Sequence, residues 1–79
     1  MNDVTATTYL YCYTLDNFKF EGDGLVEHYE THYKPSVTIE TIYINGTKFP
    51  YGVVADWVIA QLEQHVLNLW KLDQRRKQP

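Results

Sequence analysis

The chain has 79 residues, which accommodate a single domain with one hydrophobic core. Hydrophobic residues make up 44% and aromatic residues 15% of the sequence, which excludes a disordered composition. The net charge of −3 is uneven, because the first fifty residues are acidic while the C-terminal end carries Lys71, Arg75, Arg76 and Lys77. An acidic body repels phosphate backbones, so nucleic acid is not the expected main partner.

A single cysteine, Cys12, excludes an intrachain disulfide and is typical of a reducing cytoplasm. We expect Cys12 to lie in a strand and to face the hydrophobic core of the domain, where its thiol would be inert. No secretory signal is recognised, since Asp3 stands where a basic region would be and no apolar run follows. No segment approaches the roughly 18 uninterrupted apolar residues of a membrane span. The sequence therefore predicts a soluble cytoplasmic protein.

The first expected element is a strand from Thr5 to Tyr13, rich in β-favouring Thr and Tyr. Strand alternation gives it two faces, one with Ala6, Thr8, Leu10 and Cys12 and the other with Thr7, Tyr9, Tyr11 and Tyr13. Asp16-Asn17 predicts a turn, and Phe18 to Glu21 predicts a returning strand that ends at Gly22-Asp23-Gly24.

The segment from Leu25 to Tyr33 is compatible with two structures. Leu25, Tyr29 and Tyr33 have the spacing of one helical face, but the same residues also share one face of a strand. The charged and histidine side chains between them weaken the helical alternative. We predict an extended segment that ends at Pro35, because the residue before a proline avoids the α region.

A β-rich run from Val37 to Ile44 meets Asn45-Gly46 and a short return, Thr47 to Phe49. Asn-Gly between apolar runs is the strongest short-range hairpin signal, because both residues tolerate the positive φ of a type I′ turn. Ile39 and Ile42 would lie on opposite faces of a regular strand. Either a bulge realigns these two residues or both faces of the strand are covered.

Helical periodicity follows Pro50 and predicts an amphipathic helix over Tyr51 to Leu72. Its apolar stripe consists of Ala55, Val58, Ile59, Leu62, Val66, Leu69 and Trp70. Residues 1–4 and 73–79 are expected to be disordered ends of the single domain.

The predicted fold class is α+β, with three to four antiparallel strands and one long C-terminal helix packed on one face of the sheet. The expected core consists of Leu10, Phe18, Phe20, Ile39, Ile42, Ile44, Phe49, Ala55, Ile59, Leu62, Val66 and Leu69.

Two large apolar residues of the helix, Trp57 and Leu67, lie outside the core stripe. Exposed tryptophan is unusual, and aromatic residues are enriched at the energetic centres of protein interfaces. These positions are therefore candidates for protein binding, with Trp57 the best single one. The alternative is that Trp57 packs beneath the N-terminal strand or a loop.

The face formed by Tyr9, Tyr11 and Tyr13 is a second candidate contact surface, because tyrosine supplies stiff, half-polar contact area. Such a face can also stack nucleobases, although single-strand binders add a basic groove and the charges nearby are acidic. The remaining alternative is structural, since β-propensity alone favours Tyr in a strand.

No catalytic, cofactor or metal site is predicted. His28 and His32 could chelate a metal together only if their segment were helical, and a third ligand is not evident. The glycines are isolated turn residues rather than a phosphate loop, and the single serine, Ser36, has no partner histidine in register. The sequence therefore favours a protein without enzymatic activity.

The order Ile42-Tyr43-Ile44-Asn45-Gly46-Thr47-Lys48-Phe49-Pro50, running directly into a C-terminal amphipathic helix, resembles that of short accessory proteins of bacteriophages and prophages. The resemblance covers residues 37–72 and implies a cytoplasmic bacterial protein that binds and inhibits a host protein. Together these features lead us to expect a protein-binding module, whose partner is another protein, a second copy of itself in a homodimer, or both. The alternative is a nucleic-acid-binding accessory protein that uses the tyrosine face and the basic C-terminal tail.

Overall fold

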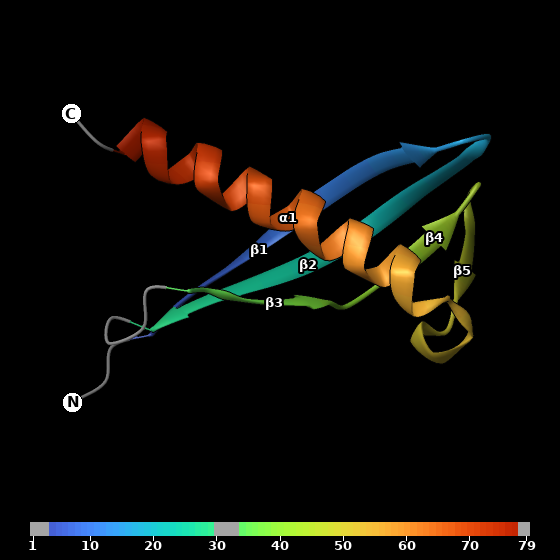
Figure 1. Ribbon diagram of the computed structural model, residues 1–79, viewed down its shortest axis with the longest axis horizontal. Coiled ribbons are helices and arrows are strands. Elements are labelled where there is room, and N and C mark those ends of the chain that lie inside the picture. Colours follow the sequence, from blue (N-terminus) through green and yellow to red (C-terminus); the bar gives the residue numbers. More distant parts are fainter. Residues whose placement is uncertain (1–3, 30–33, 78–79) are drawn as a thin grey trace.

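The computed structural model describes residues 4–29 and 34–77, which form an antiparallel sheet covered on one face by a single long helix (Figure 1). The elements in chain order are β1 (Val4–Leu15), β2 (Phe18–Tyr29), β3 (Ser36–Ile39), β4 (Ile42–Ile44), β5 (Thr47–Phe49), a short 3-10 helix η1 (Tyr51–Val53) and α1 (Asp56–Lys77). The sheet has five strands in the order β1-β2-β4-β5, with β3 also paired to β2. The predicted α+β class is confirmed.

β1 and β2 form a long regular hairpin around the turn at Asp16 and Asn17, with a register that runs from Leu15↔Phe18 to Val4↔Tyr29. The prediction that the second strand ends at the glycines is wrong, because β2 continues through them to Tyr29. The predicted extended state of the next segment is confirmed as far as Tyr29, and residues 30–33 lie outside the described residues.

The two glycines of β2 are required by close packing rather than by a chain reversal. A Cβ atom on Gly22 would overlap the backbone oxygen of Thr41. A Cβ atom on Gly24 would lie 2.7 Å from Cγ2 of Val66, a residue of α1. These positions let the β3–β4 connection and the helix approach β2 closely.

A bulge between β3 and β4 decides the register question at Ile39 and Ile42. From Gly24↔Ile39 to Glu21↔Tyr43, β2 advances by three residues while the opposite chain advances by four. One extra residue is the definition of a β-bulge, and it reverses the alternation of the side chains. Both isoleucines therefore reach the core, with exposed fractions of 2% and 1%.

The Asn45-Gly46 hairpin is confirmed. The φ angles of Asn45 and Gly46 are 50° and 87°, as a type I′ turn requires, and Ile44 pairs with Thr47 across the turn.

The helix begins and ends later than predicted. Pro50, Gly52 and the β-branched Val53 disfavour an α-helix, so η1 stands where the first α-helical turn was expected. Residues 73–77, predicted to be disordered, belong to α1, where the carboxylate of Asp73 accepts a hydrogen bond from Tyr9 in β1. At the other end, Val4 already belongs to β1, and residues 1–3 and 78–79 lie outside the described residues.

The core lies between the sheet and α1 and contains Tyr11, Phe20, Val26, Ile39, Ile42, Val58, Ile59, Leu62 and Val66. Six predicted core residues are confirmed as buried, namely Phe20, Ile39, Ile42, Ile59, Leu62 and Val66. Ile44 and Leu69 pack against this cluster while partly exposed.

Four core predictions are wrong: Leu10, Phe18, Phe49 and Ala55 are exposed. Leu10 is 82% exposed because β1 directs its tyrosine face, not its leucine face, at the helix. For the same reason Cys12, expected to face the core, is exposed on the outer face. No helix of the described residues is both long enough and apolar enough to cross a membrane.

Candidate functional site

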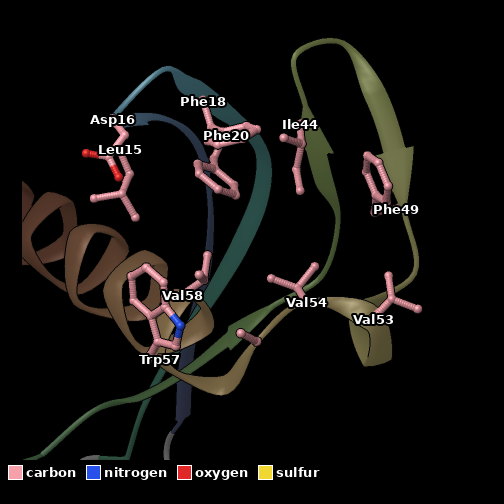
Figure 2. A pocket seen from close by; sticks show the side chains of 11 residues that line it. Leu15, Asp16, Phe18, Phe20, Ile44, Phe49, Val53, Val54, Trp57 and Val58 are labelled. Atoms are coloured by element: carbon pink, nitrogen blue, oxygen red, sulfur yellow. The ribbon is translucent and has the colours of Figure 1, made fainter.

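An apolar groove lies at the end of the molecule where α1 begins (Figure 2). Its volume is about 530 Å³. Residues of the β1–β2 turn form one side, β4 and β5 form the opposite side, and η1 and the first turn of α1 complete it. The apolar lining consists of Leu15, Phe18, Phe20, Ile44, Phe49, Val53, Val54, Ala55, Trp57 and Val58.

The groove exists because the helix starts too late to cover this end of the sheet. The tips of both hairpins extend past the first turn of α1 (Figure 1). Between Pro50 and Asp56 the chain forms only η1 and two further residues, so no helical side chains fill the space between the hairpins. The same residues that delay the helix therefore open the groove.

The walls of the groove expose several large apolar side chains together. Trp57 is 61% exposed, Phe18 52% and Val53 67%, while Phe20 and Val58 are buried. Single exposed apolar residues are common on protein surfaces, but a contiguous group around a concave surface is typical of a binding site.

Among the described residues, Asp16 is the only charged one that lines the groove, and it is an exposed residue of the β1–β2 turn. Asp56, also exposed, is the first residue of α1 and precedes Trp57 directly. The groove thus combines an apolar lining with acidic groups close to its border.

The prediction that Trp57 lies outside the core is confirmed, and its exposure excludes the alternative in which it packs beneath a strand or loop. Leu67 is half-buried and lies ten residues further along α1, about 15 Å away at the rise of an α-helix. Leu67 therefore does not line the groove beside Trp57.

The tyrosine face is occupied by the helix, which corrects the prediction of a free contact surface at Tyr9, Tyr11 and Tyr13. Tyr11 is 3% exposed, and its hydroxyl donates to the backbone oxygen of Thr41 at 2.7 Å. The hydroxyls of Tyr9 and Tyr13 donate to two residues of α1, Asp73 at 2.8 Å and Gln61 at 3.0 Å.

Two of these phenols have raised pKa values. Burial raises the pKa of Tyr9 to about 12, and the hydrogen bond to Asp73 and its negative charge add to the effect. Burial also raises the pKa of Tyr11 to about 12, with a further contribution from the charge of Asp23. Both hydroxyls therefore act as neutral hydrogen-bond donors, which connect β1 to α1 through Tyr9 and to the β3–β4 connection through Tyr11.

Histidine 28 is half-buried, and its ring centroid lies 5.2 Å from that of Trp70 in α1. His32, its partner in the hypothetical metal site, lies outside the described residues. Within residues 4–29 and 34–77, no group of three or more His, Cys, Asp or Glu side chains could hold a metal ion.

Sequence reasoning placed Phe18 and Phe49 in the core and did not single out Val53, although all three line the groove. Pro50 and Gly52 were the sequence features that could have indicated the groove, because they delay the start of the helix and leave the apolar residues near its first turn uncovered.

Comparison of the chain with protein-family models gave no match, and comparisons with curated proteins and with solved structures gave none either.

Proposed function

We propose that this chain is a small non-enzymatic protein-binding module whose groove beside Trp57 takes an apolar segment of another protein. The observation that carries the proposal is the group of exposed apolar side chains around the groove, with Trp57, Phe18 and Val53 each more than half exposed. Burying a large apolar side chain at an interface contributes roughly 1.5–3 kcal/mol, so three such residues supply a large driving force.

The chemistry of the groove indicates what the partner presents. A concave apolar surface of this size accepts one or two aliphatic or aromatic side chains. Asp16 and Asp56 near its border favour lysine or arginine beside that apolar anchor, because opposite charges steer association. The partner segment is therefore apolar at its centre and basic at its flanks.

The resemblance to accessory proteins of bacteriophages and prophages supports a bacterial host protein as the partner. Such a module acts as a cytoplasmic modulator or inhibitor of that protein by occupying one of its surfaces. The alternative nucleic-acid-binding role is disfavoured, because the tyrosine face that would stack bases lies under α1.

The test is a comparison of Trp57→Ala with Leu10→Ala in quantitative capture from a bacterial lysate, followed by calorimetry with the purified partner. Removing a tryptophan from the centre of an interface costs about 2 kcal/mol or more, so Trp57→Ala weakens binding about 30-fold. Leu10 is equally apolar and 82% exposed but lies on the opposite face of the sheet, so Leu10→Ala retains the partner. Equal capture by both folded variants would refute the role of the groove.

A further inference from the structure

The long outer edge of β1 has no strand beside it in the described structure. β1 stands at the end of the strand order β1-β2-β4-β5 and is 12 residues long. Its sequence, VTATTYLYCYTL, contains no charged residue and no proline. Its register with β2 is regular throughout, without a bulge.

The printed hydrogen bonds determine which backbone groups point outward. The oxygens of Lys19 and Asp23 accept from Asn45 and Glu40, so odd-numbered residues of β2 direct their backbone groups away from β1. Backbone groups alternate sides along a strand, so even-numbered residues of β2 face β1. Because even residues of β2 pair with odd residues of β1, the groups that point out of the sheet belong to Val4, Ala6, Thr8, Leu10, Cys12 and Thr14.

The other two edges of the sheet are protected. β3 has four residues and follows Pro35, while β5 has three residues, contains Lys48 and precedes Pro50. Short length, lysine and proline are the features by which natural sheets prevent pairing with another chain. The longest edge lacks all of these features, which indicates that pairing at β1 is permitted.

We propose that β1 pairs antiparallel with β1 of a second copy of this chain and joins the two sheets into one. Each strand offers six outward N–H groups and six outward oxygens, so up to about twelve hydrogen bonds can form, as in a typical protein interface. A two-fold axis brings identical strands together antiparallel, and an uncharged strand meets itself without repulsion.

The surroundings of β1 agree with a second copy as the occupant. The nearest outer-face acids, Glu21, Asp23 and Glu27, belong to β2 and not to the edge itself. Across the joint they would lie about three strand spacings from their counterparts, roughly 14 Å, which exceeds the screening length of about 8 Å. In Figure 1 the C-terminal part of α1 diverges from β1 on the side away from β2, so the helix can cover an added strand from above.

The test is the molar mass in solution by light scattering at several concentrations, with Thr8→Pro as the decisive variant. The N–H of Thr8 points away from β2, so proline there removes no bond within the chain but blocks pairing at the edge. We expect the wild type to reach twice the 9.3 kDa chain mass and Thr8→Pro to stay at the chain mass with an unchanged circular dichroism spectrum.

Lys48→Pro is the matched control, because its N–H also points outward, from the edge strand β5. This variant keeps the dimer. If Thr8→Pro does not fold, Thr8→Lys serves in its place, since it sets like charges close together near the centre of the joint. A monomeric wild type at every concentration, or a folded Thr8 variant that remains dimeric, would overturn the proposal. Trp57→Ala leaves this dimer intact, so the dimer interface and the groove are tested separately.

Discussion

The hydroxyl of Tyr11 is predicted to stabilise the fold at neutral pH and to lose this effect in alkali. Tyr11 stands opposite Gly22 in the β1–β2 register, and its hydroxyl reaches the backbone oxygen of Thr41 on the other side of β2. Replacement by phenylalanine keeps the buried ring and removes only this hydrogen bond, at 2.7 Å. A neutral hydrogen bond of this kind contributes about 1 kcal/mol, so Tyr11→Phe lowers Tm by about 4–8 °C at pH 7 in a domain of this size.

The pH dependence of this effect has a definite sign. The pKa of Tyr11 is about 12 in the folded chain, against about 10 for an ordinary tyrosine in the unfolded chain. Between these values the unfolded state releases the proton while the folded state keeps it, so the free energy of unfolding decreases as the pH rises. The contribution is complete below about pH 10 and is lost progressively towards pH 12. Tyr9, whose pKa is also about 12, adds a loss of the same sign.

Thermal denaturation of wild type and Tyr11→Phe between pH 7 and pH 11.5 measures both effects. The Tm difference between the two proteins is largest near pH 7 and shrinks above pH 10, because only the wild type carries the Tyr11 proton. Tyr51→Phe is the control, since Tyr51 is 52% exposed, and we expect its Tm to stay close to that of the wild type at each pH. Two Tm curves that stay parallel up to pH 11.5 would refute the assignment of a buried, neutral donor to Tyr11.

Two further predictions concern the hairpin and the core. Gly46→Ala lowers the free energy of unfolding by about 1 kcal/mol in urea denaturation, because the φ of 87° is unfavourable for a residue with a Cβ atom. Gly52→Ala, at a glycine with open space around it, is the control and should be nearly neutral; equal losses at both positions would contradict the turn assignment. Leu62→Ala removes a fully buried side chain and costs about 2–5 kcal/mol, a large part of the roughly 4–12 kcal/mol expected for 79 residues. Leu10→Ala, on the exposed face of β1, should change stability by less than about 0.5 kcal/mol, and a loss comparable to that of Leu62→Ala would show that Leu10 is buried.

The two faces of β1 illustrate where sequence reasoning stops. Alternation correctly separated the tyrosines from Leu10 and Cys12, but period two alone does not say which face points inward. We predicted that the face with Leu10 would be buried, but in the structure the face with Tyr11 is buried and Leu10 is exposed.

The reason lies in the partner strand. Tyr9 stands opposite Gly24 and Tyr11 opposite Gly22, so large rings fill the space beside residues without side chains. The missing Cβ at Gly24 also allows Val66 of α1 to come close to the sheet on that face. The two-residue turn at Asp16 and Asn17 fixes this register, so the pairing of tyrosine with glycine was present in the sequence as a signal.

The sequence by itself determined the elements whose signals are local. The Asn45-Gly46 turn follows from the φ angles those two residues tolerate, and the buried side of α1 follows from the spacing of Ile59, Leu62 and Val66. The tertiary structure alone decided how the elements meet, through the one-residue bulge before Ile42 and the late start of α1. The groove beside Trp57 arises from that arrangement, because its walls come from the β1–β2 turn, the β4–β5 hairpin and α1, and their distances are set by packing rather than by neighbouring residues in the chain.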